Sequence, residues 1–291
     1  MIWTLRVANT QLHVLDYIHQ RISVFDLETQ KHLLDLPLPL NQDGVQEPSW
    51  LAKTRQNGLF YKPINFYVRP DEYYYIFFGD EDIGTGDNIR GRTYEVSVYD
   101  PAEKKYLEHD LFTFEYTGQI MVYERDDRMA VFSDIPYKRS SQFSYSGTEL
   151  IYGWTDEMLF KVYDEDGNYQ QAFYHPQSGI PFEVEDALAQ YQNPGGNIVR
   201  AIRNDTLPET WPAFDAMKLD DKGRLWISAF TSDPHTYDWR VMDTADGQLL
   251  TQFRWPRERQ IEVIKGGKLY TRERDKETGL EEIVRYDIEI E

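Results

Sequence analysis

A short motif recurs along this chain at the ends of predicted β-strands. It consists of an apolar residue, an aromatic residue and an aspartate, and a turn and another strand follow it. Clear copies are Val24-Phe25-Asp26, Val98-Tyr99-Asp100 and Val162-Tyr163-Asp164, and weaker copies are Val241-Met242-Asp243 and Arg285-Tyr286-Asp287. After two copies an Asp-Gly pair, at 166–167 and 246–247, supplies the positive φ of a tight hairpin turn. The repeating unit is therefore strand, turn, strand.

Aromatic residues are abundant around this motif. The chain contains 7 Trp, 21 Tyr and 15 Phe, which stand beside Val and Ile in short runs that Gly, Asp and Asn interrupt. Such runs are typical of β-strands. We predict strands at 11–16, 21–26, 73–78, 94–100, 129–133, 149–154, 159–164, 224–230, 239–243, 268–272 and 282–287.

One segment, residues 182–193, predicts a helix. Apolar residues recur there at the spacing of one helical face, at Val184, Ala187, Leu188 and Tyr191. Acidic residues fill its first turn, and Asn193-Pro194-Gly195-Gly196 ends it. A mostly-β chain with one isolated helix is a large sandwich, a barrel or a radially repeated sheet.

The spacing of the motif favours the radially repeated sheet. Successive motif aspartates lie 74, 64, 79 and 44 residues apart, and the last interval matches one four-stranded propeller blade of roughly 40–50 residues. The 261 residues from Asp26 to Asp287 divide into about six such units. We therefore predict an all-β fold: one six-bladed β-propeller domain over residues 1–291, with four-stranded antiparallel blades and an inserted helix at 182–193. Five or seven blades are the alternatives.

Closure of this propeller leaves one strand unaccounted for. The first blade can use residues 3–7, 11–16, 21–26 and 31–38, whereas the last has only 261–264, 268–272 and 282–287. Either residues 3–7 complete the last blade, or native residues precede Met1.

Two segments resemble known propeller families. Residues 16–26, Asp-Tyr-Ile-His-Gln-Arg-Ile-Ser-Val-Phe-Asp, resemble an NHL-type blade, with His19 where that pattern has Asn. Residues 207–214, Leu-Pro-Glu-Thr-Trp-Pro-Ala-Phe, with 219–227, Leu-Asp-Asp-Lys-Gly-Arg-Leu-Trp-Ile, are similar to a late blade of bacterial six-bladed, TolB-like propeller proteins. The resemblance implies a propeller fold and suggests a location in the cell envelope, and it carries over no catalytic residue.

Charge and segment length exclude several partners. The net charge of −19 repels phosphate backbones, so nucleic acid is excluded as a partner. The longest apolar run, residues 73–78, is far shorter than the roughly 20 residues of a membrane-spanning helix. With no basic leader at its start, the chain is cytoplasmic, or it is a periplasmic, extracellular or lipid-anchored domain whose leader was removed. Cysteine is absent, which excludes disulfides and thiol catalysis. We expect a monomer.

Two sets of residues are candidate sites. Asp80, Asp82 and Asp87 lie in a Gly-rich acidic segment whose oxygen atoms could hold calcium; a solvated acidic loop is the alternative. Arg200 and Arg203 precede Trp211 and could bind an anionic or sugar-like ligand by hydrogen bonding and stacking. Alternatively, the arginines pair with acidic surface groups while Trp211 fills space between blades.

Recognisable catalytic signatures are missing. The six histidines show no zinc-ligand spacing, and no serine stands in a nucleophile elbow. We therefore expect a non-enzymatic module that binds a protein, a small molecule or a carbohydrate. The alternatives are a calcium-dependent hydrolase of the propeller lactonase kind and a structural or signalling propeller within a longer envelope protein.

Overall fold

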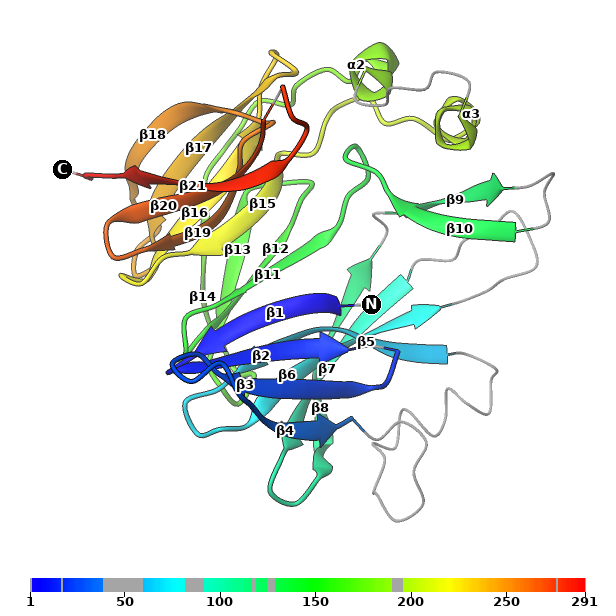
Figure 1. Cartoon of the computed structure of the whole chain (residues 1–291). Coiled ribbons are helices and arrows are strands. Elements are labelled where there is room, and N and C mark those ends of the chain that lie inside the picture. The colour runs from blue at the N-terminus through cyan, green and yellow to red at the C-terminus, as the bar shows by residue number, and fades with distance from the viewer. Residues whose placement is uncertain are drawn as a thin grey trace. The chain divides into compact units, whose positions relative to one another are not determined.

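The computed structural model describes residues 2–16, 18–38, 60–81, 92–116, 119–124, 129–189, 196–275 and 277–290 (Figure 1). The chain divides into two compact units, Met1–Tyr116 with Glu165–Asn168, and Thr117–Asp164 with Tyr169–Glu291. Among the helices of the described ranges, none has the length and apolar character to cross a membrane. A single domain over residues 1–291 stays a prediction.

The first unit holds two four-stranded antiparallel sheets whose strands neighbour one another in chain order. The first sheet contains β1 (Ile2–Ala8), β2 (Gln11–Asp16), β3 (Arg21–Asp26) and β4 (His32–Pro37). The second contains β5 (Phe60–Val68), β6 (Tyr74–Glu81), β7 (Arg92–Asp100) and β8 (Lys105–Tyr116). Because β1 pairs with β2, residues 2–8 are the first strand of the first blade.

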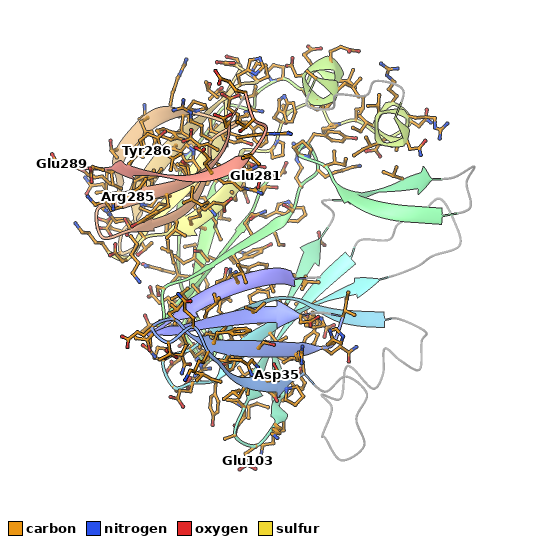
Figure 2. The ribbon with its side chains drawn as sticks, viewed as in Figure 1. Asp35, Glu103, Glu281, Arg285, Tyr286 and Glu289 are labelled. Atoms are coloured by element: carbon orange, nitrogen blue, oxygen red, sulfur yellow. The ribbon has the colours of Figure 1, made fainter. Side chains whose placement is uncertain are left out.

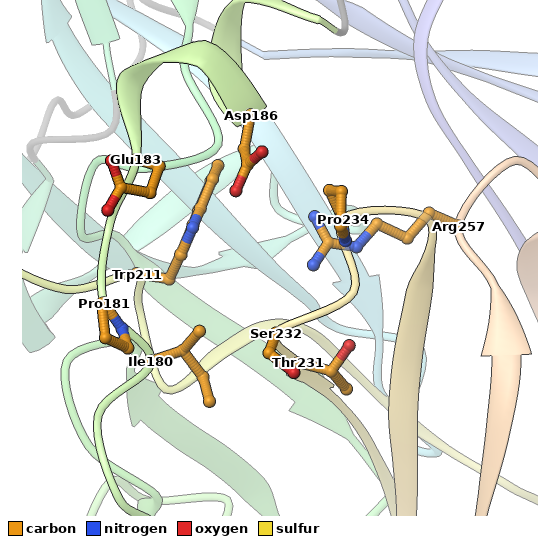
Figure 3. A pocket seen from close by; sticks show the side chains of 9 residues that line it. All are labelled: Ile180, Pro181, Glu183, Asp186, Trp211, Thr231, Ser232, Pro234 and Arg257. Atoms are coloured by element: carbon orange, nitrogen blue, oxygen red, sulfur yellow. The ribbon is translucent and has the colours of Figure 1, made fainter.

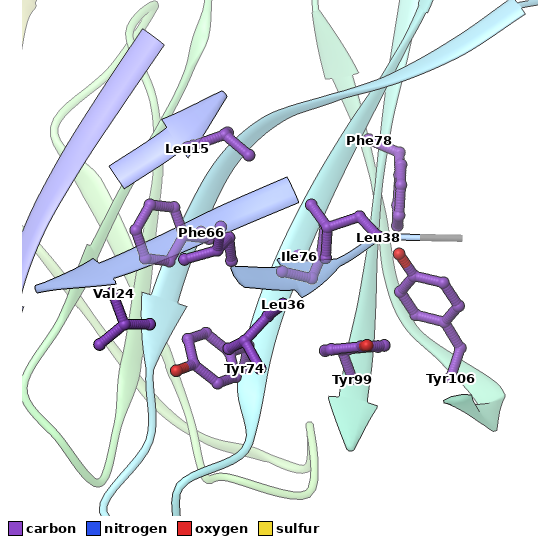
Figure 4. Packing of buried hydrophobic residues seen from close by; sticks show 11 residues of the cluster. Leu15, Val24, Leu36, Leu38, Phe66, Tyr74, Ile76, Phe78, Tyr99 and Tyr106 are labelled. Carbon is purple, nitrogen blue, oxygen red and sulfur yellow. The ribbon is translucent and has the colours of Figure 1, made fainter. Parts of the chain in front are cut away.

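The core of the first unit lies between these two sheets (Figure 4). Leu15 and Ile22, which face each other across β2 and β3, are fully buried there. Phe66 and Phe78 from the second sheet are also fully buried, and each such side chain contributes about 1.5–3 kcal/mol by leaving water. The hydroxyl of Tyr99 donates a hydrogen bond to the carbonyl oxygen of Pro37 at 2.7 Å, which joins the sheets.

The second unit holds two further four-stranded antiparallel sheets, one three-stranded antiparallel sheet and one two-stranded ribbon. The ribbon is β9 (Gln119–Glu124) with β10 (Met129–Asp134). The next sheet contains β11 (Ser141–Tyr145), β12 (Leu150–Trp154), β13 (Leu159–Tyr163) and β14 (Tyr169–Tyr174). It is followed by β15 (Phe214–Leu219), β16 (Arg224–Phe230), β17 (Thr236–Asp243) and β18 (Leu249–Pro256). The last is three-stranded, with β19 (Gln260–Lys265), β20 (Lys268–Arg274) and β21 (Glu281–Asp287).

The described residues therefore form an all-β fold built of propeller blades, and the number of blades is five. Six blades, the sequence-based prediction, is wrong, and the alternative of five is confirmed. The β9–β10 ribbon and the helical segment lengthen the sequence intervals between blades without adding a blade. The repeated motif lies at the end of the third strand in each of the five sheets; its last copy, with Arg285 and Tyr286, is labelled in Figure 2.

The helical segment differs from the prediction. Within the described residues, helix α2 covers Val184–Leu188, and a second helix, α3, covers Asn197–Arg203. The helix does not begin at Phe182, because the backbone of Glu183 is still extended, with φ −115° and ψ 122°. The Phe182 amide donates to the carbonyl oxygen of Glu209, and Pro181 forms a β-bridge with Thr210. Residues 190–195, where we predicted the end of the helix, lie outside the described residues. Helix α3 was not predicted, because its β-branched residues have a low helix propensity. Two of its apolar residues, Val199 and Ile202, form its buried face.

Candidate functional site

Arg200 and Arg203, two of the predicted ligand-binding residues, lie on the exposed face of α3. Val199 and Ile202 occupy the buried face of this helix, so the arginines point to solvent. The guanidinium of Arg200 donates to the side-chain oxygen of Asn197 at 2.8 Å. The structure does not bring either arginine into the cavity that Trp211 lines.

Trp211 is buried and lines that cavity. Its amide donates to the carbonyl oxygen of Ile180 at 2.9 Å, which fixes the backbone of both segments. Its ring stacks on Phe230, with centroids 5.0 Å apart and an interplanar angle of 19°, and meets the edge of Phe182. These contacts hold the indole in one orientation.

The cation beside Trp211 is Arg257, which follows the end of β18. The central carbon of its guanidinium lies 4.6 Å from the ring centroid of Tyr237, 4.8 Å from that of Phe230 and 5.8 Å from that of Trp211. Its Nε donates to the carbonyl oxygen of Thr236 at 3.1 Å. Burial lowers the pKa of this guanidinium, and the nearby carboxylates of Asp215, Asp233 and Asp186 oppose that change. Within the part of the chain that the structure describes, Arg257 forms no ion pair with a carboxylate.

Tyr237, one of the three rings around Arg257, is itself anchored. Its hydroxyl donates to the Asp215 carboxylate at 2.8 Å. Burial raises the pKa of Asp215, and the hydrogen bond from Tyr237 and the charge of Arg257 oppose that change. Burial also raises the pKa of Tyr237, so the phenol stays protonated and keeps donating. The aromatic surroundings of Arg257 are therefore built in advance of any ligand.

A cavity of about 200 Å³ lies in front of Arg257 and Trp211 (Figure 3). Its lining residues are Ile180, Pro181, Glu183, Asp186, Trp211, Thr231, Ser232, Pro234 and Arg257. In Figure 3 the Arg257 guanidinium and the Asp186 carboxylate point toward the same space, beside the ring of Trp211. All the lining residues belong to the second unit. The arrangement offers a fixed cation, an aromatic ring and two carboxylates to a small molecule.

Sequence reasoning identified Trp211 but not Arg257, which lies 46 residues later. The pairing of Thr236 with Pro256 in the β17–β18 hairpin brings Arg257 beside Tyr237. The one available signal in the sequence is the two-residue spacing of Trp255 and Arg257, which would place both side chains on one face if the strand continued; in the structure the strand ends at Pro256.

The predicted calcium ligands lie largely outside the described residues. Asp82 and Asp87 are not among them, and of Asp80 only the backbone is described, paired with Tyr61 between β5 and β6. In the described ranges, no group of three or more His, Asp and Glu side chains is placed to hold a metal ion. A calcium site at residues 80–87 stays a prediction.

No protein-family model matches the chain, and no curated protein does. Solved structures that match this chain include hydrazine synthase from Kuenenia stuttgartiensis, at 12% identity and a TM-score of 0.42; the match covers 96% of this chain and 60% of that one. Regucalcin from Agrobacterium tumefaciens, a calcium-binding protein, matches at 13% identity and a TM-score of 0.40, covering 99% and 77%. A luciferin-regenerating enzyme matches at 10% identity and a TM-score of 0.37, covering 98% and 90%. The resemblance to NHL-type and TolB-like proteins stays a prediction.

Proposed function

We propose that this chain is a binding module that takes a small carboxylate-bearing ligand in the cavity of Arg257 and Trp211. The observation that carries the proposal is the environment of the Arg257 guanidinium. Its guanidinium is half-buried among three aromatic rings, and one backbone carbonyl accepts from its Nε. Buried charges in proteins are normally paired, and the planar donor fork of arginine matches a carboxylate. The carboxylates of Asp215, Asp233 and Asp186 act on Arg257 only from a distance, without forming an ion pair with it. A ligand carboxylate would pair with the guanidinium directly.

The charges around the cavity favour a carboxylate over a phosphate. Glu183 and Asp186 line the same cavity as Arg257, so its side chains carry two negative charges and one positive charge. A dianion would gain one favourable pairing and meet two like charges, whereas a monoanion held on Arg257 meets less repulsion. The cavity is also smaller than the roughly 300–1,000 Å³ typical of sites for drug-sized ligands. These features support a small monocarboxylate group rather than a nucleotide or a protein surface.

The test is a calorimetric titration of the full chain with 4-methylpentanoate at millimolar concentrations. Arg257→Gln removes the cation from the cavity and is expected to weaken binding tenfold or more, because charge-assisted hydrogen bonds contribute about 1.5–3 kcal/mol. Arg257→Lys keeps the charge but not the planar fork, and it serves as a second variant if Arg257→Gln lowers stability.

Arg200→Gln and Arg203→Gln are matched controls, because each removes the same charge from an exposed helix face. They also test the earlier sequence-based hypothesis. Binding that depends on Arg200 or Arg203 and not on Arg257 would refute the proposed site. Melting midpoints of all the variants show whether a loss of binding reflects loss of folding.

A further inference from the structure

The side of the cavity formed by the α2 segment carries two unpaired carboxylates. Glu183 immediately precedes α2 and is exposed, and Asp186 lies within the helix and is half-buried. Within the described residues, neither carboxylate accepts a hydrogen bond or forms an ion pair. Their backbone is nevertheless fixed, because the Asp186 amide donates to the carbonyl oxygen of Glu183 at 3.1 Å.

Asp186 and Arg257 face the same space without closing it. Figure 3 shows both charged groups pointing toward the space beside Trp211, and their nitrogen and oxygen atoms are more than 4.0 Å apart, because no ion pair forms between them. A molecule with one negative and one positive group could therefore pair with both at once. A molecule with only one charge would satisfy one of the two protein groups and be repelled by the other.

The rest of the lining fits an aliphatic group. Ile180, Pro181 and Pro234 add apolar surface beside the indole of Trp211. A volume of about 200 Å³ accommodates a molecule about the size of one amino acid. The hydroxyl of Ser232 lies at the same cavity and can donate to an oxygen of the ligand.

We propose that the cavity binds a small zwitterion, namely a free α-amino acid with an apolar side chain. Its carboxylate pairs with Arg257, its ammonium pairs with Asp186 and, at the exposed edge, with Glu183, and its side chain packs against Trp211 and Ile180. This assignment rests on the proposed function, because it keeps the carboxylate on Arg257 and adds the class of the ligand.

The experiment compares three probes that share the branched apolar end of leucine. Leucine carries both charged groups, 4-methylpentanoate lacks the ammonium, and 3-methylbutylamine lacks the carboxylate. Calorimetric titration of the full chain near neutral pH is expected to show leucine binding about tenfold or more tightly than either analogue. The two analogues share its apolar end, so the difference reports the second charge pair.

Variants of the carboxylates on the α2 side test whether they pair with the ammonium group of the ligand. Asp186→Asn is expected to weaken leucine binding about tenfold and to leave 4-methylpentanoate binding unchanged or slightly tighter, since a repelling charge is removed. Glu183→Gln acts in the same directions by a smaller factor, because Glu183 is exposed to solvent. Glu185→Gln removes the same charge from the same helix at a residue that does not line the cavity, and it should change neither affinity.

The outcomes separate the two proposals. If 4-methylpentanoate binds in an Arg257-dependent manner and leucine binds no more tightly, the zwitterion assignment is overturned and the carboxylate site stands. If Asp186→Asn weakens leucine and 4-methylpentanoate equally, the ammonium does not pair with Asp186 and the assignment is again overturned. If none of the three probes binds at millimolar concentration, or Arg257→Gln changes no affinity, the proposed function fails and the zwitterion assignment fails with it.

Discussion

Replacing Asp220 should be among the most destabilising single changes in the second unit. Asp220 lies in the turn between β15 and β16, and its side chain is 1% exposed. One carboxylate oxygen accepts from the amides of Lys222 and Arg224, both at 2.9 Å. The other accepts from Arg224 Nε at 2.7 Å and from the indole nitrogen of Trp226 at 2.9 Å. One buried carboxylate thus closes a turn and anchors a fully buried tryptophan.

The size of the effect follows from these four bonds. Asp220→Ala leaves the buried indole N–H of Trp226 without its acceptor and leaves the Arg224 guanidinium without its charge partner. Removing one partner of a buried ion pair typically costs about 3–5 kcal/mol, a large part of a total stability of about 5–15 kcal/mol. Asp220→Asn keeps the volume and one acceptor oxygen, but its amide NH₂ would face donors, so we expect a loss of about 2–3 kcal/mol.

Urea unfolding at neutral pH, followed by circular dichroism, measures these losses. Asp246→Ala is the matched control. Asp246 is an exposed aspartate in a turn, and its carboxylate accepts a hydrogen bond from the Gln248 amide. Removing this side chain should lower the free energy of unfolding by less than about 1 kcal/mol. Should Asp220→Ala fail to fold, Asp220→Asn supplies the measurement. A free energy of unfolding for both Asp220 variants within about 1 kcal/mol of the unmodified chain would refute the reasoning.

The same carboxylate gives stability a defined pH dependence. Burial tends to raise the pKa of Asp220, but the hydrogen bonds from Trp226, Arg224 and Lys222 outweigh it and hold the pKa below its ordinary value. A carboxyl whose folded-state pKa is depressed contributes stability above its unfolded pKa of about 3.9 and loses that contribution as pH falls through the folded pKa. The difference in unfolding free energy between the unmodified chain and Asp220→Asn should therefore shrink below about pH 4.

Two further predictions concern a turn and the acidic segment of residues 80–87. Gly247 and Gly223 both have φ near +75°, but a Cβ at Gly247 would lie 2.4 Å from Phe173 Cβ, whereas one at Gly223 meets nothing within 4 Å. Gly223→Ala should cost about 1–2 kcal/mol from backbone strain, and Gly247→Ala about 1–3 kcal/mol more; equal losses in urea unfolding would contradict this. If residues 80–87 hold calcium, added calcium should raise the thermal midpoint relative to EDTA; an unchanged midpoint would rule out such a site.

The motif predicted the number of blades better than chain length did. Its five copies end the third strands β3, β7, β13, β17 and β21, one for each blade. The aspartate recurs because it accepts from amides of the turn that follows, as Asp26 does from Thr29 and Asp100 from Ala102. Dividing the number of residues between the first and last copies by the length of one blade gave six blades. This estimate is too high because the residues of the β9–β10 ribbon and of the two helices were counted as part of the blades.

Sequence patterns found the strands inside each blade and missed most of those at its edges. In β16, six of the seven residues are buried, and β16 was predicted with its observed bounds. In β14 and β18 the burial is intermittent, because the outer strand of a blade faces solvent, and neither was predicted. A strand that buries few residues carries a weak alternation, so packing against its neighbour, rather than its own pattern, defines it.

The arginine of the candidate site could not be chosen by closeness in sequence. Arg200 and Arg203 are nearer to Trp211 along the chain, but they are three residues apart on a helix whose other face is buried, so both face solvent. Arg257 reaches the rings through pairing: Tyr237 pairs with Phe230 on one side and with Trp255 on the other. Arg257 lies in the turn that follows β18, where its amide donates to the carbonyl oxygen of His235 at 2.9 Å and its guanidinium lies over Tyr237. In a fold of hairpins, the register between strands decides which charge meets which ring, and a single sequence does not reveal that register.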